Sequence, residues 1–266
     1  MKKLLPGMMA LVLALAFVGC GKAETTESTP VASSSEVVAS SEASSVAEST
    51  EESTEESSEE IVETAAGMTY AEYVAAELQS EVDVVMYVQA HQSWWDNKVT
   101  VYAADADGAY FIYEMACSEE DAAKLVPGAK ILVHGFKAEW AGEVEITDAT
   151  FEFVEDGDSF IAEAKDVTAM VGTDEIAAYM NQLVSFQDMT VEAVSYKNYQ
   201  PGDDIYVTLS KDGVTVEFCL EYYLNGSDEE LYNTVGNLEV GSTVDVTGFL
   251  YWYEGPDAHI TAVTVK

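Results

Sequence analysis

Residues 128–151 read GAKILVHGFKAEWAGEVEITDATF, and residues 241–265 repeat the same pattern as GSTVDVTGFLYWYEGPDAHITAVTV. Three glycines align between the two copies: Gly128 with Gly241, Gly135 with Gly248 and Gly142 with Gly255. Apolar residues alternate with polar ones along both limbs of each copy, which is the period of a strand with one buried face. Each copy therefore predicts a β-hairpin, and the chain contains an internal repeat.

The segments before the two hairpins follow one order as well. In the first copy, a capping box at Thr69 and Glu72 predicts a short helix to about residue 78. Strands are expected at 82–90, 99–104 and 109–116, then a helix at 118–126. In the second copy, we expect a helix at 173–182, strands at 189–196, 205–209 and 214–222, and a helix from residue 227. Residues 155–172 are assigned only as a connection.

Three strands, a helix and two further strands are the order of the OB fold, a small five-stranded barrel. The duplicated pattern resembles exported bacterial lipoproteins with tandem OB-fold domains, over about residues 69–266. We therefore expect a mainly β chain with two tandem OB-like barrels, each with short helices, at 68–158 and 166–266. An SH3-like barrel, or another small β-barrel with an inserted helix, is the alternative fold.

The N-terminal residues have the three parts of an export signal. Lys2 and Lys3 precede an apolar run at 8–18, and Gly19 is a small residue before Cys20. The sequence FVGC resembles the lipobox of bacterial lipoproteins, although Phe17 stands where that family usually has leucine. The resemblance implies a signal peptide at 1–19, lipidation of Cys20 and anchoring at the extracytoplasmic face of the cell membrane. An ordinary signal peptide with an incidental cysteine is the alternative.

Residues 20–67 form a Ser/Glu-rich segment with twelve glutamates. Low hydrophobicity and self-repulsion predict a disordered linker there, and a tail that binds a cationic partner is the alternative. Cys117 and Cys219 occupy different positions in the two repeats. We expect free thiols, with a disulfide between them as the alternative.

The charge of the chain is strongly one-sided. Its 266 residues contain 49 Asp and Glu against 11 lysines and no arginine, for a formal net charge of −38. Nucleic-acid binding usually draws on Lys and Arg to displace counterions, and an acidic surface repels phosphate. From charge alone we expect no nucleic-acid partner.

Aromatic residues supply the candidate binding site. OB folds bind ligands on the face of strands two and three and between the loops that join strands one to two and four to five. All four tryptophans fall in those predicted loops, where an exposed indole is costly without a partner. The candidate ligand-binding residues are Trp94, Trp95, Trp140, Tyr199, Tyr251 and Trp252. In the alternative, these rings plug barrel ends or pack between domains, and an extended Trp94-Trp95 pair turns at least one ring inward.

No catalytic pattern is present. The sequence has no nucleophile elbow, phosphate loop or zinc pattern, and its three histidines lack metal-ligand spacing. Asp105 and Asp107, and separately residues 155–158, could hold calcium, but neither stretch provides a complete calcium loop, and Asp-Gly turns explain most of these residues. We therefore predict a non-enzymatic cell-surface module, without cofactor or metal, for a neutral or cationic envelope ligand such as a glycan, peptide or protein. The alternatives are a structural display or assembly module and, more remotely, a hydrolase.

Overall fold

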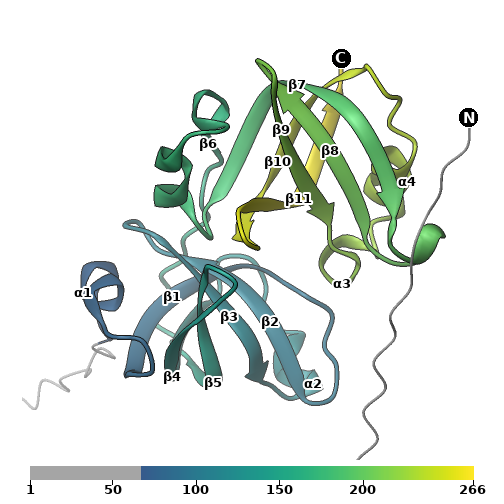
Figure 1. The fold of residues 1–266 in the computed structure, drawn as a ribbon. Helices are drawn as coiled ribbons and strands as arrows, with labels where there is room; N and C mark the ends of the chain where they lie inside the picture. Colours follow the sequence, from purple (N-terminus) through teal and green to yellow (C-terminus); the bar gives the residue numbers. More distant parts are fainter. Residues whose placement is uncertain (1–66) are drawn as a thin grey trace, which may run out of the picture. The chain divides into compact units, whose positions relative to one another are not determined.

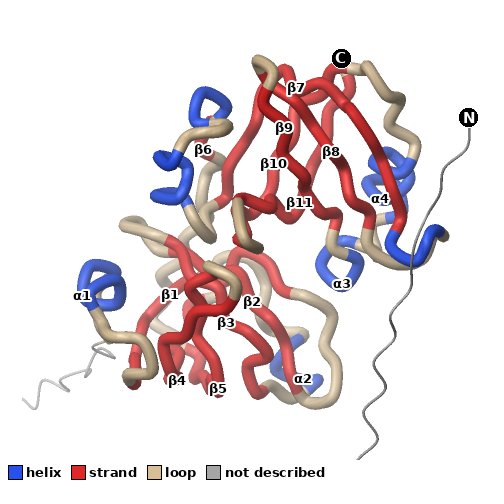
Figure 2. Tube along the Cα trace, viewed as in Figure 1, coloured by secondary structure: helices blue, strands red, loops and turns tan. Residues whose placement is uncertain are grey.

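The computed structural model describes residues 67–266 (Figure 1). The predicted signal peptide, Cys20 and almost all of the predicted linker lie outside the described residues. The two barrels that follow belong to one compact unit. Strands are the main regular structure of the described chain, and the helices between them are short (Figure 2).

The first barrel contains five strands: β1 (Glu81–His91), β2 (Lys98–Ala104), β3 (Ala109–Ala116), β4 (Lys130–Trp140) and β5 (Glu143–Phe153). They close in the order β1-β2-β3-β5-β4, with β3 meeting β5 in parallel at Ile112 and Ile146. Helix α2 (Glu119–Ala122) lies between β3 and β4 in sequence, which is the OB arrangement. Helix α1 (Tyr70–Ala75) begins at the predicted capping box but ends earlier than expected.

The second barrel repeats this topology with β7 (Leu183–Tyr196), β8 (Ile205–Lys211), β9 (Val214–Leu220), β10 (Thr243–Trp252) and β11 (Pro256–Val265). Strand β10 also pairs with β7, which closes the barrel, and the short β6 (Lys165–Asp166) adds to the edge of β7. Helices α3 (Tyr222–Asn225) and α4 (Glu229–Gly236) separate β9 from β10. The predicted fold class, two tandem five-stranded OB-like barrels, is confirmed.

Some local predictions differ from the structure. The helix expected at 173–182 is a 3-10 segment, η2 (Asp174–Tyr179), and β7 begins six residues before the predicted strand. The connection at 155–172 contains β6 and a second 3-10 segment, η1 (Thr168–Met170). A third, η3 (Lys197–Tyr199), links β7 to β8.

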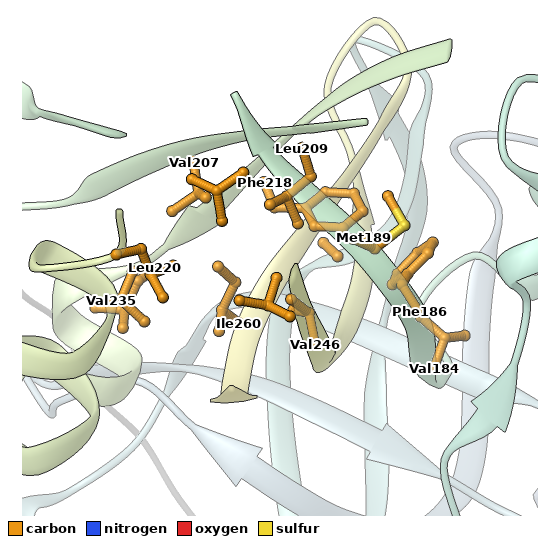
Figure 3. Close-up of a cluster of buried hydrophobic side chains, with 14 of the residues drawn as sticks. Val184, Phe186, Met189, Val207, Leu209, Phe218, Leu220, Val235, Val246 and Ile260 are labelled. Carbon is orange, nitrogen blue, oxygen red and sulfur yellow. The ribbon is translucent and has the colours of Figure 1, made fainter. Parts of the chain in front are cut away.

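Each barrel has its own apolar core. Inward-facing side chains of the second barrel meet around the pair of Phe186 and Phe218, whose ring centroids are 4.6 Å apart (Figure 3). The first core is built around Ile112, Ile131 and Ile146. Cys117 and Cys219 are both free thiols with little exposure. Burial raises the pKa of the Cys117 thiol to about 11, with a smaller contribution from Asp121.

Candidate ligand-binding groove

A tight turn between β1 and β2 holds Trp95 at the surface. The backbone groups of Trp95 and Lys98 exchange hydrogen bonds of 3.0 and 2.9 Å across Asp96 and Asn97. Both central residues have positive φ, at 49° and 60°, as a type I′ turn requires, and Asp and Asn tolerate that conformation. The indole of Trp95 is left 72% exposed.

A β-bulge in β3 shapes the neighbouring surface. Tyr113 and Glu114 together oppose the single residue Thr100 of β2, and Glu114 has a positive φ of 47°. Its N–H donates to the Thr100 Oγ1 at 3.2 Å. Bulges redirect side chains, and here two consecutive residues of β3 are exposed. The matching pair in the second barrel, β8 and β9, runs without a register shift.

Trp95, Tyr113 and Tyr223 line one groove of about 350 Å³ on the β2–β3 face. Tyr223 comes from α3 of the second barrel, and its carbonyl accepts hydrogen bonds from the Ser93 N–H at 2.7 Å and the Ser93 Oγ at 3.1 Å. The three rings are all substantially exposed. The remaining lining residues are Gln92, Ser93, Lys98, Val99, Thr100 and Glu114. The groove is therefore composed from both barrels.

The groove holds one cation, which is already paired. Lys98 Nζ contacts Glu114 Oε2 at 2.6 Å, and this hydrogen bond raises the pKa of Lys98. The Tyr113 hydroxyl donates to the other Glu114 oxygen at 3.3 Å, and the pKa of Tyr113 is raised by burial and then by the Glu114 charge. A second hollow of about 610 Å³ shares Lys98, Tyr113 and Glu114 and extends toward β5.

The other lysines of residues 67–266 are engaged in the same way. This part of the chain has 37 Asp and Glu against eight Lys. Lysine nitrogens contact carboxylates, backbone carbonyls or the Gln182 amide oxygen in every case. A ligand phosphate would therefore meet lysines whose charge is already shared with an internal partner.

The remaining predicted site residues lie apart from this groove. Trp94 points inward, donates from Nε1 to the Cys117 carbonyl at 2.9 Å and packs on the first core. Trp140 is exposed and pairs with Tyr253 at 5.3 Å, whereas Trp252 packs on the second core. Tyr251 stacks on His259 at 4.5 Å, and Tyr199 is 99% exposed on η3. Of the six predicted binding residues, only Trp95 lines the groove.

Sequence reasoning missed Tyr113, Tyr223 and the Lys98–Glu114 pair. Tyr113 and Glu114 break the apolar run of β3, and that break is the signal of the bulge. Tyr223 has no comparable signal, because its position depends on how the second barrel packs against the first. Asp105, a candidate calcium ligand that the sequence assigns to an Asp-Gly turn, accepts hydrogen bonds from the Asp107 and Gly108 N–H groups and the Tyr110 hydroxyl.

No protein-family model and no curated protein matches the sequence. Solved structures do match. The p204 HINb domain is 14% identical with a TM-score of 0.35, over 72% of this chain and 100% of that one. The Ifi202 HINa domain in complex with 20-bp double-stranded DNA is 12% identical with a TM-score of 0.33, over 70% of this chain and 98% of that one. At this similarity the likeness bears on fold alone, and the strand order already gives the OB-like fold.

A replication protein A heterotrimer bound to single-stranded DNA is 14% identical with a TM-score of 0.29, over 71% of this chain and 49% of that one. Two predictions from the sequence conflict with the DNA named in the descriptions of these neighbours and are withdrawn: a surface module for a neutral or cationic envelope ligand, and the absence of a nucleic-acid partner. The charge argument considered only phosphate contacts, whereas OB folds also hold bases by stacking. Within residues 67–266, no helix is long and apolar enough to span a membrane.

Proposed function

We propose that this chain binds unpaired nucleic acid by stacking bases on the groove formed by Trp95, Tyr113 and Tyr223. The observation that carries the proposal is the convergence of three exposed rings on one groove at the β2–β3 face. That face is where OB folds take their ligands. Stacking on aromatic side chains is a sequence-tolerant way to hold bases, because every base has a π-face.

The groove favours a single strand over a duplex. Bases in a duplex are already stacked and paired, so a surface ring reaches a π-face only when the base is free. A volume of about 350 Å³ suits a short stretch of strand rather than a double helix. We propose binding without chemical change, so the oligonucleotide should be recovered intact after incubation.

The charge of the chain sets an unusual salt dependence for this binding. Ordinary nucleic-acid binders lose affinity as salt rises, because counterions released by Lys and Arg contacts are recaptured. Here the lysines are engaged internally and the surface is acidic, so salt mainly screens repulsion. We expect the affinity for a labelled 12-nucleotide oligo-dT, measured by fluorescence anisotropy, to stay level or rise between about 50 and about 300 mM NaCl. A steep fall with salt would contradict stacking-driven binding.

Replacing Trp95 with alanine should weaken oligo-dT binding by about 5- to 150-fold, because base stacking is worth roughly 1–3 kcal/mol per ring. The matched control is Trp140→Ala, which removes another exposed indole that lies outside the groove and should leave the affinity unchanged. Equal losses in both variants would place binding elsewhere. If the wild-type chain binds neither single-stranded DNA nor RNA, the proposed function is wrong.

We propose in addition that Cys20 is lipidated and anchors the chain at the extracytoplasmic face of the cell membrane. Support comes from the residues themselves: two lysines, an apolar run and FVGC. In a bacterial host expressing the full chain, an alkyne fatty acid should label the wild type and not Cys20→Ser. A Cys20→Ser chain that stays labelled and membrane-bound would contradict the anchor.

A further inference from the structure

Aromatic side chains from both barrels pack together between them. Tyr102 and Phe111 of the first barrel meet Phe249 and Tyr251 of the second. The rings of Tyr102 and Phe249 stack at 4.6 Å, and those of Phe111 and Tyr251 lie 5.2 Å apart. The Tyr102 hydroxyl is hydrogen-bonded to Nδ1 of the buried His259. We call this aromatic contact, together with the adjoining tips of the two repeated hairpins (residues 140–143 and 252–255), the junction.

The tips of the two repeated hairpins meet at the edge of the junction. The Glu254 N–H donates to the Ala141 carbonyl at 2.8 Å, and the Trp252 N–H donates to Glu143 Oε2 at 2.8 Å. Gly142, between them, has a φ of +95°, and a Cβ there would come within 2.7 Å of the Trp252 ring. Gly142, which aligns with Gly255 in the repeat, therefore allows the two hairpins to approach each other closely.

Glu143 is fully buried and only partly satisfied. Its exposed fraction is 0%, and its Oε1 has no hydrogen-bond partner. It makes no ion pair within residues 67–266. Lys137, a buried lysine of the same barrel, instead donates to carbonyls of Tyr73, Val74 and Ala76 at the end of α1. An ionised carboxylate in such a place is costly, because nothing compensates its charge.

Titratable groups surround Glu143 from several elements. Glu145 follows on the same strand and is 7% exposed, and the buried Asn181 donates to the Val144 carbonyl at 3.0 Å. The pKa values of Tyr73, Tyr102 and Tyr251, from α1, β2 and β10, are raised by burial and, to a smaller extent, by the Glu143 charge. Burial raises the pKa of Glu143 to about 8, against the lowering effect of the nearby Asn181 amide and of the Trp252 N–H hydrogen bond and with a smaller rise from Glu145.

The junction also determines whether the groove is complete. Tyr223 reaches the groove only because α3 of the second barrel is held at Ser93 of the first. We infer that protonation of Glu143 controls the junction: the neutral carboxyl keeps the barrels docked, and loss of the proton loosens them and withdraws Tyr223 from the groove. The effect on ligand binding rests on the proposed function, whereas the change at the junction does not.

The test uses the full chain labelled with 5-fluorotryptophan, and ¹⁹F NMR follows the Trp252 resonance, assigned by Trp252→Phe. In the wild type we expect this resonance to move between pH 6 and 9.5 with a midpoint near 8. Glu143→Gln should abolish the transition, and the matched control Glu145→Gln should keep it. A transition that persists in Glu143→Gln would overturn the inference, as would a wild-type resonance that does not move.

A second readout needs no variant. The radius of gyration of the wild type, from small-angle scattering, should increase between pH 6.5 and 9 if the junction loosens, and a constant value would overturn the inference.

The affinity for oligo-dT should fall over the same pH range by about fivefold or more in the wild type, since one stacking ring is lost, and should stay level in Glu143→Gln. If no oligonucleotide binds at any pH while the Trp252 transition behaves as expected, the junction inference stands and the proposed function fails.

Discussion

Replacing Lys137 with methionine should destabilise the first barrel by about 1–3 kcal/mol, the range expected when buried polar groups lose their partner. The Nζ of Lys137 donates to the carbonyls of Tyr73, Val74 and Ala76 at 3.0, 2.8 and 2.9 Å. These carbonyls lie at the end of α1, where a helix leaves its last acceptors without intrahelical partners. The side chain is only 7% exposed, and its ammonium lies 5.3 Å from the Tyr73 ring centroid. Methionine keeps the apolar stem and removes the donor.

Urea unfolding followed by far-ultraviolet circular dichroism would measure this loss. The matched control is Lys124→Met, because Lys124 pairs only with exposed Glu120 and Asp121 on its own turn. Such surface pairs are worth about 0.3–0.5 kcal/mol. If the two variants lose similar stability, the three carbonyls do not depend on Lys137 and the assigned capping role is wrong.

The parts of the fold with strong local signals could be predicted. The aligned glycines and alternating apolar residues gave both hairpins, and Thr69 caps α1 through the Glu72 N–H as its spacing suggests. The α-helix expected at 173–182 does not form, and the reason is local. Thr173 donates its hydroxyl to the Met170 carbonyl instead of accepting from the next turn, so the segment starts without a side-chain cap and remains 3-10.

Only the part of the candidate site that comes from a single barrel could be predicted from the sequence. The turn at Asp96 and Asn97 leaves Trp95 exposed, and strand alternation turns Trp94 inward, as expected for adjacent rings. Tyr223 and Glu143 lie beyond such reasoning. Their roles arise from the contact between the barrels, which depends on shape and packing over more than a hundred residues of separation rather than on any local pattern.

Glu143→Gln should stabilise the protein, and the gain should grow with pH. The folded pKa of Glu143, about 8, lies above its model-peptide value of 4.5, so the folded state binds more protons than the unfolded state between these values. Wild-type stability from this group is therefore complete below about pH 4.5 and is lost as pH rises toward 8. Glutamine cannot ionise and escapes that loss.

The difference in unfolding free energy between Glu143→Gln and wild type should increase by about 3 kcal/mol from pH 5.5 to 8.5, at roughly 1.4 kcal/mol per pH unit up to the folded pKa. Urea unfolding at both pH values measures this difference. Burial also raises the pKa values of Asp257 and Glu221 to about 7, but both groups titrate in the wild type and in the variant, so their contributions cancel in the comparison. Glu145→Gln provides the control. Its side chain makes no hydrogen bond to the second barrel within residues 67–266, and burial raises its pKa, so Glu145→Gln should change stability with pH but keep the pH transition of the Trp252 resonance seen in the wild type. A constant difference for Glu143→Gln would mean that its carboxyl is already ionised at pH 5.5, and that burial at the junction does not hold the proton.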